Sequence, residues 1–351
     1  MTRSAVLSAL LATCLLTTPA LADGTLFVGT DTEEFHNVLP DRLGRFTTNG
    51  PSIVGGGIIS IPYPLNGVAN GGGFLFAGDA LSSTLRRIDY NGTLLTSTPA
   101  GFPSGCCNED MVLDGTNLYH AHFSTNIQRI DPITGAVLAT FAQGDVVGMA
   151  LVGDQIWISK WGARQVGTWD PATNIFTPVF DTATNAGGLA YDQNDNILWV
   201  GRQGGFVGPY DLSGAPLGPE FQPFGDIGDT IDGLELVCAP AISAGSATPS
   251  VLWPPNHKMV SVTLDYTVQN CGGATSCAVV SITSNEPVDN GGDGHTSPDW
   301  VVVDATHVKL RAERSGSGSG RIYTITVRCT DQAGQAAETT ITVTVPHDRR
   351  S

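Results

Sequence analysis

Charge, and positive charge above all, is scarce in this sequence. Only 14% of its 351 residues are Asp, Glu, Lys or Arg, whereas these residues make up roughly 25% of an average soluble domain. The 17 Lys and Arg are outnumbered by 33 Asp and Glu, which gives a net charge of −16. Nucleic acids and anionic membrane surfaces bind clustered positive charge, so both are excluded as partners.

Several common site motifs are missing as well. No Cys-x-x-Cys pair or His-x-x-His spacing indicates a zinc site. No nucleophile elbow or phosphate-binding loop is present, and no apolar run beyond the N-terminus approaches the length of roughly 18 residues that marks a membrane span. Glycine is abundant, with 43 residues beside 21 prolines and a hydrophobic share of 41%. This composition is typical of a folded, turn-rich, all-β protein.

The N-terminus is predicted to be a signal peptide over residues 1–22. Arg3 is followed by an apolar run from Ala5 to Leu16, and the segment ends in Ala20-Leu21-Ala22, which has the form of a cleavage site. The alternative is a lipoprotein signal ending at Cys14, although Thr13 fits that motif poorly. We therefore expect a secreted protein, either extracellular or periplasmic.

Export makes disulfide bonds the expected use of the remaining cysteines. Six cysteines allow 15 pairings. One arrangement closes the Gly-Gly loop between Cys271 and Cys277 and ties Cys238 to Cys329, whereas a bond between the adjacent Cys106 and Cys107 would be strained. The six are Cys106, Cys107, Cys238, Cys271, Cys277 and Cys329.

A pattern of short strands recurs along residues 24–237 with a period near 42 residues. Each repeat has a second strand with an aliphatic anchor and a third strand with an aromatic or Ile anchor, and four of the third-strand anchors precede Asp. The second-strand anchors are Leu26, Leu75, Leu118, Ile156 and Leu198. The third-strand anchors are Phe46, Ile88, Ile130, Trp169 and Tyr210, spaced by 42, 42, 39 and 41 residues. Such a repeat is the signature of a β-propeller.

The repeats predict a five-bladed propeller over residues 23–237. The first repeat lacks its first strand, and an extra first strand, Gly233-Leu234-Glu235, stands at the end of the series. A chain that supplies the missing strand last closes a ring, which removes exposed sheet edges. The alternative is a sixth, irregular blade inside the long loop expected at residues 47–65.

Three segments of the repeat resemble secreted bacterial propellers of the NHL, YVTN and streptogramin-lyase-like type. They are Gly187–Asp192, Asn196–Val200 and Ile130–Gly135. The resemblance implies the propeller fold and leaves the function open, because such propellers include enzymes, binding proteins and scaffolds. For the lyases it implies catalysis by a histidine and a bound metal.

The C-terminal part is predicted to be an immunoglobulin-like β-sandwich. Residues 238–250 are rich in small residues and read as a linker, and residues 251–351 contain six segments that alternate apolar and polar residues. Leu252–Lys258, Ser284–Pro287 and Cys329–Gly334 resemble bacterial modules related to HYR domains. That resemblance implies an adhesion or spacer unit.

Polar residues recur at equivalent places in the repeat, four residues after each second-strand anchor. These are Thr30, Asp79, His122, Lys160 and Arg202. The first strands begin on the same side of the propeller, where they carry Asn66, Glu109, Asp110 and Asp232. We expect these side chains to form a ring at one mouth of the central channel, where propellers bind ligands.

The residue types at this ring suggest a division of roles. Asp79 and Glu109 would suit a divalent cation such as calcium or magnesium. Lys160 and Arg202 would bind a carboxylate or a sugar acid, and His122 would act as a general base. The alternative is that the ring binds no ligand. Its oppositely charged side chains would then pair with one another and only keep the channel mouth hydrated.

Other residues give weaker signals. Trp161 lies in an expected loop and could stack on a sugar. His120 is expected to face the opposite way from His122 and to pack between blades. Two carboxylate clusters are possible calcium ligands: Asp31, Glu33 and Glu34 with His36, and Asp289, Asp293 and Asp299.

The sequence favours a secreted ligand-binding or adhesion protein, expected to be a monomer, with the propeller as recognition head and the sandwich as spacer. Its partner would be a small polar ligand, a glycan or a surface protein. The first alternative is a propeller lyase or hydrolase acting on a polar ester, lactone or acidic sugar. The second is a structural protein of the cell envelope.

Overall fold

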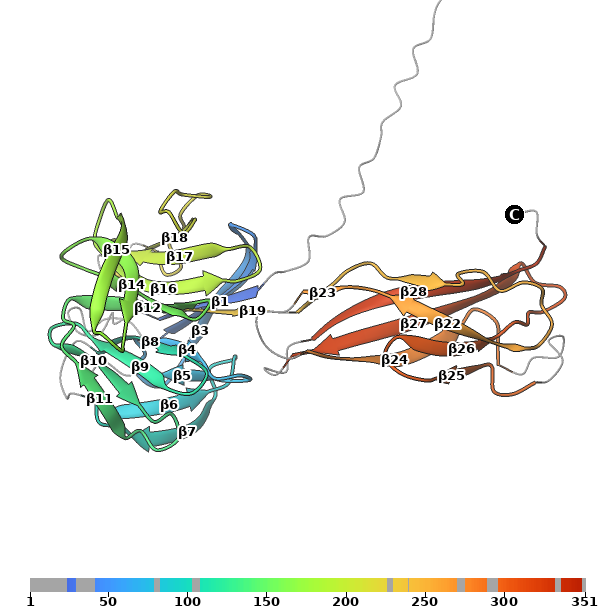
Figure 1. The fold of residues 1–351 in the computed structure, drawn as a ribbon, viewed down its shortest axis with the longest axis horizontal. Coiled ribbons are helices and arrows are strands. Elements are labelled where there is room, and N and C mark those ends of the chain that lie inside the picture. The colour runs from blue at the N-terminus through green and yellow to red at the C-terminus, as the bar shows by residue number, and fades with distance from the viewer. Residues whose placement is uncertain are drawn as a thin grey trace, which may run out of the picture.

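A computed structural model describes residues 24–29, 42–78, 83–102, 108–225, 230–238, 240–269, 275–288, 296–331 and 336–348 (Figure 1). All regular elements in these ranges are β-strands. They therefore include no helix that is long and apolar enough to cross a membrane. The expected signal peptide, Thr30, Asp79, Cys106, Cys107 and Cys271 lie outside the described residues.

The described strands of the first part form five antiparallel sheets. The first sheet has the order β19-β1-β2-β3, with β1 at Gly24–Gly29, β2 at Arg42–Asn49, β3 at Ser52–Ser60 and β19 at Gly233–Cys238. The second has β4 at Val68–Asn70, β5 at Leu75–Ala77, β6 at Thr84–Ile88 and β7 at Leu94–Pro99. The third has β8 at Asn108–Leu113, β9 at Leu118–His122, β10 at Asn126–Ile130 and β11 at Val137–Phe141. The fourth has β12 at Val146–Val152, β13 at Gln155–Lys160, β14 at Gln165–Asp170 and β15 at Ile175–Asp181, and the fifth has β16 at Ala186–Asp192, β17 at Ile197–Arg202 and β18 at Phe206–Tyr210.

The expected ring closure is confirmed. Strand β19 pairs antiparallel with β1, from Gly24 opposite Cys238 to Gly29 opposite Gly233. The inner strands β4, β8, β12, β16 and β19 lie next to one another in that cyclic order. The first part of the chain is therefore a β-propeller, in which the end of the repeat region completes the first sheet.

The sequence anchors occupy facing positions in every sheet. Each second-strand anchor is directly opposite the third-strand anchor of its own repeat. Leu118, for example, faces Ile130, and both are fully buried. Opposed apolar side chains stabilise a strand pair, which explains why the repeat keeps this spacing. The Asp after a third strand accepts backbone N–H groups of its own turn, as Asp131 does from Ile133 and Thr134.

The expected loop at residues 47–65 is wrong, and so is the sixth blade placed within it. Most of this segment is β3, the outer strand of the first sheet. Glycine lowers the strand propensity of this segment. The outer strand β3 tolerates its glycines because it pairs with β2 only. Gly57, for instance, has no atom within 4 Å of the place where a Cβ would stand.

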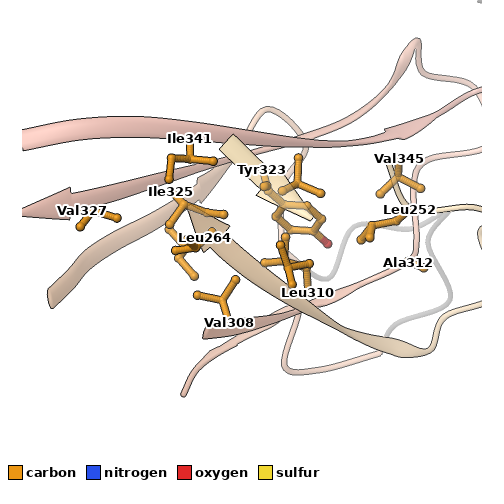
Figure 2. Packing of buried hydrophobic residues seen from close by; sticks show 14 of the residues in the cluster. Leu252, Leu264, Val308, Leu310, Ala312, Tyr323, Ile325, Val327, Ile341 and Val345 are labelled. Carbon is orange, nitrogen blue, oxygen red and sulfur yellow. The ribbon is translucent and has the colours of Figure 1, made fainter. Parts of the chain in front are cut away.

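The second part of the chain packs two further sheets around a core of its own (Figure 2). One sheet has the order β21-β22-β26-β25, with β21 at Ser246–Thr248, β22 at Met259–Asp265, β25 at Trp300–Val302 and β26 at His307–Arg311. The other has the order β24-β27-β28, with β24 at Ser276–Ser284, β27 at Gly320–Thr330 and β28 at Ala336–Pro346. A short pair joins β20, Ala241–Ile242, to β23, Val268–Gln269. Leu264 and Leu310 from the first sheet meet Tyr323 and Ile341 from the second.

The cysteine pairing differs from the arrangement suggested by the loop. Cys277 is bonded to Cys329, because β24 and β27 place the two residues directly opposite each other. The pairings Cys271–Cys277 and Cys238–Cys329 are therefore wrong. Cys238 is itself disulfide-bonded.

Candidate functional site

The buried polar side chains of the propeller concentrate at the end where the inner strands begin. We call this the polar end and define it by the following buried residues: Asn66, Asn108, Glu109, Asp110, His122, Ser159, Thr230 and Asp232. The second strands end at the same place, because each is antiparallel to its inner strand. The polar end therefore collects residues from sheets far apart in the sequence.

Strand register brings three of the expected site residues to equivalent positions. His122 is opposite Asn108, Lys160 is opposite Val146, and Arg202 is opposite Ala186. Each partner is the first residue of an inner strand. The three side chains therefore start from the same level of the propeller, although their contacts diverge.

Lys160 is held by residues of its own sheet and the turn before it. Its ammonium donates to Gln143 Oε1 at 2.9 Å and to the carbonyl oxygen of Gly144 at 2.5 Å. The charge lies 5.6 Å from the centre of the Phe176 ring, and burial lowers the pKa of the amine. These contacts direct Lys160 toward a local cluster.

Arg202 is likewise committed to a nearby partner. Its guanidinium donates to Glu220 Oε2 at 2.5 Å, and Glu220 Oε1 accepts the Tyr210 hydroxyl at 2.8 Å. Glu220 lies in the irregular segment after β18, outside the repeat. The structure thus gives both expected carboxylate-binding cations other partners.

Trp161, expected to stack on a sugar, contacts Phe123 edge-on, with ring centres 6.5 Å apart.

Asp110 lies at the centre of the ring, where the other inner strands carry glycine. A Cβ on Gly148 would stand 2.1 Å from the carbonyl oxygen of Gly187, and one on Gly233 would stand 2.0 Å from that of Asn66. Neighbouring inner strands therefore touch backbone to backbone, which requires glycine.

The Asp110 side chain joins three sheets. Its Oδ2 accepts the backbone N–H of Met149 at 3.1 Å and that of Leu189 at 3.2 Å. Met149 lies on the inner strand of the fourth sheet and Leu189 on that of the fifth, whereas Asp110 belongs to the third. Burial raises the pKa of the carboxyl well above its usual value. At the level of Asp110 the inner strands are therefore packed directly against one another, through this side chain and the glycines of the other strands.

The histidines of β9 share one face, which corrects the expectation that they face opposite ways. Residues two apart on a strand point to the same side. Leu118, on that face, packs with Phe76 of the second sheet, whereas the intervening Tyr119 packs with Ile156 of the fourth. His120 is packed between sheets as expected: it is fully buried and stacks on Phe102 with ring centres 4.2 Å apart.

The two imidazoles are held differently. His122 Nδ1 is 3.0 Å from Thr125 Oγ1, which orients its ring. His120 has no hydrogen-bond partner on either ring nitrogen, and burial lowers its pKa to about 3. Burial also lowers the pKa of His122. Both rings are therefore neutral at pH 7.

Two amides missed by the sequence analysis lie beside these histidines on β10. Gln128 is directly opposite His120, and Asn126 is directly opposite His122. The buried oxygen of each amide has no partner. The signal that could have found them is the antiparallel register of β9 and β10, which the facing anchors Leu118 and Ile130 define.

Glu109 and Asp232 are buried at the polar end, with 7% and 5% of their surfaces exposed. Asn66 donates from Nδ2 to the carbonyl oxygen of Asn108 at 2.9 Å, which links the second and third sheets. Among the described residues, no group of three or more His, Cys, Asp or Glu is placed to hold a metal ion.

The opposite end of the propeller has a groove of about 360 Å³ between the third and fourth sheets. Its acidic residues mostly serve their own turns. Asp114 Oδ1 accepts the backbone N–H groups of Thr116 and Asn117, and Asp170 accepts that of Ala172. The carboxylates of Asp114 and Asp170 in this groove are therefore committed to their own turns.

Asp299, a possible calcium ligand, is an ion-pair partner inside the sandwich. Its Oδ2 accepts Arg321 Nη1 at 2.7 Å, and Glu313 Oε1 accepts the same nitrogen at 3.1 Å. The segments Leu252–Lys258 and Ser284–Pro287 meet here, because Glu286 Oε2 lies 3.4 Å from Arg321 Nε and His257 Nδ1 lies 3.4 Å from Glu313 Oε2. These motif residues build a buried charge network. The clusters at residues 31–36 and 289–293 lie outside the described ranges.

The sequence matches no model of a known protein family and no curated protein. Among solved structures, a chain from a nidogen–laminin complex is similar over 62% of this chain and 98% of its own, with 17% identity and a TM-score of 0.41. The glutaminyl cyclase of Myxococcus xanthus is similar over 57% of this chain and 83% of its own, with 14% identity and a TM-score of 0.38. The computationally designed Ika4 protein is similar over 42% and 91%, with 15% identity and a TM-score of 0.32. These likenesses assign no function to the chain.

Proposed function

We propose that the protein is a secreted binding protein that takes a small polar ligand or a glycan at the polar end of its propeller. The observation that carries this proposal is the concentration of buried polar side chains at that end. A fold that gathers such groups in one place is suited to binding hydrogen-bonding ligands there.

The contacts of the basic residues narrow the ligand class. Lys160 and Arg202 have partners of their own, so they do not favour a sugar acid. Glu109 and Asp232 contribute carboxyl groups, which accept hydrogen bonds when ionised. A neutral, hydroxyl-rich ligand complements such acceptors best.

The location and the second part of the chain fit this role. The Cys277–Cys329 disulfide is favoured outside the cytosol, in agreement with the expected signal peptide. The two-sheet sandwich would then be an immunoglobulin-like spacer that holds the propeller away from a surface.

Mature protein, residues 23–351, should be tested by thermal shift and calorimetry against a panel of neutral mono- and disaccharides and sugar acids. We expect a neutral sugar to bind, and Glu109→Gln or Asp232→Asn to weaken that binding at least ~10-fold, the usual effect of losing a charged hydrogen bond. The matched control is Asp154→Asn, an exposed carboxylate at the opposite end. Absence of binding across the panel, or equal binding by all variants, would overturn the proposal.

The second candidate is general-base catalysis by His122 on an ester or lactone. Thr125 orients its ring, and burial lowers its pKa, so the imidazole is neutral and able to accept a proton. Hydrolysis of a panel of p-nitrophenyl esters and lactones by the wild type, lost in His122→Ala, is the expected result for an enzyme. Unchanged turnover in that variant would remove His122 from the reaction.

A further inference from the structure

The β9 histidines bring two imidazoles to one face of a single strand. His120 and His122 are separated by one residue and point toward the second sheet, as their neighbour Leu118 does. On a strand such residues are neighbours along the same face. Spacing of this kind allows two ring nitrogens to converge on one point.

The surroundings of these rings contain lone pairs without hydrogen-bond donors. Both nitrogens of His120 are buried and unpartnered, and the side-chain hydrogen-bond contacts of His122 are made by its Nδ1. Gln128 donates from Nε2 to the carbonyl oxygen of Gly101 at 3.3 Å, which leaves its Oε1 unpartnered. Asn126 donates from Nδ2 to Thr125 Oγ1 at 2.9 Å, which leaves its Oδ1 unpartnered.

Buried polar atoms in folded proteins almost always have partners. Each amide here already uses its N–H₂ group, so both amide oxygens offer lone pairs. A neutral imidazole carries one N–H and offers one further lone pair from its other nitrogen. A hydrophobic neighbour would leave these atoms unsatisfied, whereas a cation would satisfy several of them at once. The shared chemistry of the cluster is therefore that of a metal-ligand set.

We propose that His120 and His122 together bind one divalent transition-metal ion of the zinc and copper class, with the amide oxygen of Gln128 as a further donor. Imidazole nitrogen suits zinc, copper and nickel, whereas calcium and magnesium prefer oxygen. The ion needs no Asp, Glu or third His, and water completes its coordination. This is an exchangeable site of two imidazoles, unlike the closed four-ligand sites of structural zinc.

Two features prepare the histidines for this role. A ligating histidine usually donates its other ring N–H to a fixed acceptor, and His122 Nδ1 has Thr125 Oγ1 at 3.0 Å for that purpose. Both ring nitrogens of His120 are buried without a hydrogen-bond partner, so an ion bound there would displace no existing hydrogen bond. The inference does not depend on the proposed sugar binding, because its test needs no sugar.

The test is titration of metal-free mature protein with Zn²⁺ by calorimetry at pH 7.5. We expect one Zn²⁺ per chain in the wild type. His122→Gln and His120→Phe should weaken binding by at least ~100-fold, and Thr125→Val by ~10–100-fold, the range reported for lost outer-shell partners. The matched control is His307→Ala, which removes an exposed histidine bonded to Asp304 and should leave binding unchanged.

A second measurement keeps the proposal testable if the buried His120 variant fails to fold. Wild-type protein loaded with Cu²⁺ should show, by electron paramagnetic resonance, splitting from two coordinated imidazole nitrogens. Thr125 is exposed, so Thr125→Val reports on the site with little risk to the fold. The proposal is overturned if the wild type binds no Zn²⁺, if His122→Gln binds it equally well, or if the copper spectrum lacks two nitrogens. If the wild type binds Zn²⁺ but none of the sugars of the panel, only the proposed function is contradicted.

Discussion

Glu235 offers a direct test of how the ring is closed. It lies on the closing strand β19, and its Oε2 accepts the backbone N–H of Asn70 from β4 at 3.0 Å. The carboxyl thus joins the first sheet to the second. Burial raises its pKa from 4.5 to about 7, and the charge of Glu235 in turn contributes to the raised pKa of Asp110 and of Tyr90.

The raised pKa makes the stability of the propeller depend on pH. Below pH 4.5 the carboxyl is protonated in both the folded and the unfolded chain, so it causes no penalty. As the pH rises, the unfolded chain releases this proton first, and the free energy of unfolding falls until the folded carboxyl has also ionised, near pH 7. The difference between 4.5 and about 7 corresponds to about 3 kcal/mol, since one pKa unit is worth about 1.4 kcal/mol.

The perturbation is Glu235→Gln, which keeps an oxygen for the Asn70 N–H and removes the charge. Urea unfolding followed by tryptophan fluorescence should be measured from pH 4.5 to pH 8, because four of the six tryptophans lie in the repeat region. We expect the variant to gain about 3 kcal/mol relative to the wild type across this range. The control is Glu338→Gln, a half-exposed carboxylate on β28. A wild-type-to-variant difference that stays constant with pH would refute the reasoning.

Three further variants test the architecture by calorimetry and urea unfolding. Asp110→Ala should cost about 3 kcal/mol because two buried N–H groups lose their acceptor, whereas Asp110→Asn should cost much less; equal losses would contradict this. Gly233→Ala should destabilise the propeller by about 3 kcal/mol, since the added methyl would stand 2.0 Å from a carbonyl oxygen, and Gly57→Ala should be neutral; a harmless Gly233→Ala would show that the inner strands are not in contact. Replacing Cys277 and Cys329 together by Ala should cost the sandwich about 4 kcal/mol, because the bond closes a loop with a sequence separation of 52; an unshifted sandwich transition would rule out that bond.

The propeller could be predicted from the sequence because its repeat encodes the contacts that build it. Leu118 and Ile130 recur at a fixed spacing in each unit, and that spacing makes them opposite neighbours in a sheet. The displaced first strand at Gly233 likewise predicted ring closure. The pattern can be recognised even where one repeat varies, because the other repeats show the same spacing.

Features that occur once were harder to predict. The Cys277–Cys329 bond depends on the register between β24 and β27, and spacing alone does not reveal register. Arg202 was expected to line the mouth, but its partner Glu220 comes from an irregular segment that the repeat does not contain. Long flexible side chains pair with whichever acceptor the local fold supplies, so their direction cannot be read from their position in a repeat.

The direction of His120 could have been obtained from the sequence. It is two residues from His122, and a strand has a period of two, so both side chains point the same way. Gln128 and Asn126 then follow from antiparallel pairing across the turn at Phe123–Thr125. The pair of histidines is thus visible in the sequence once strand geometry is applied.

The closing strand has a consequence for the order in which the protein folds. Strand β1 is the first described strand to emerge during synthesis, and its partner β19 follows only at residues 233–238. Until then β1 has an unsatisfied edge, and exposed edges are sites of aggregation. Pairing between such distant segments is slow. The first sheet is therefore begun first and completed last, so a nascent chain interrupted before residue 233 has the other four sheets of the propeller and a first sheet that still lacks β19.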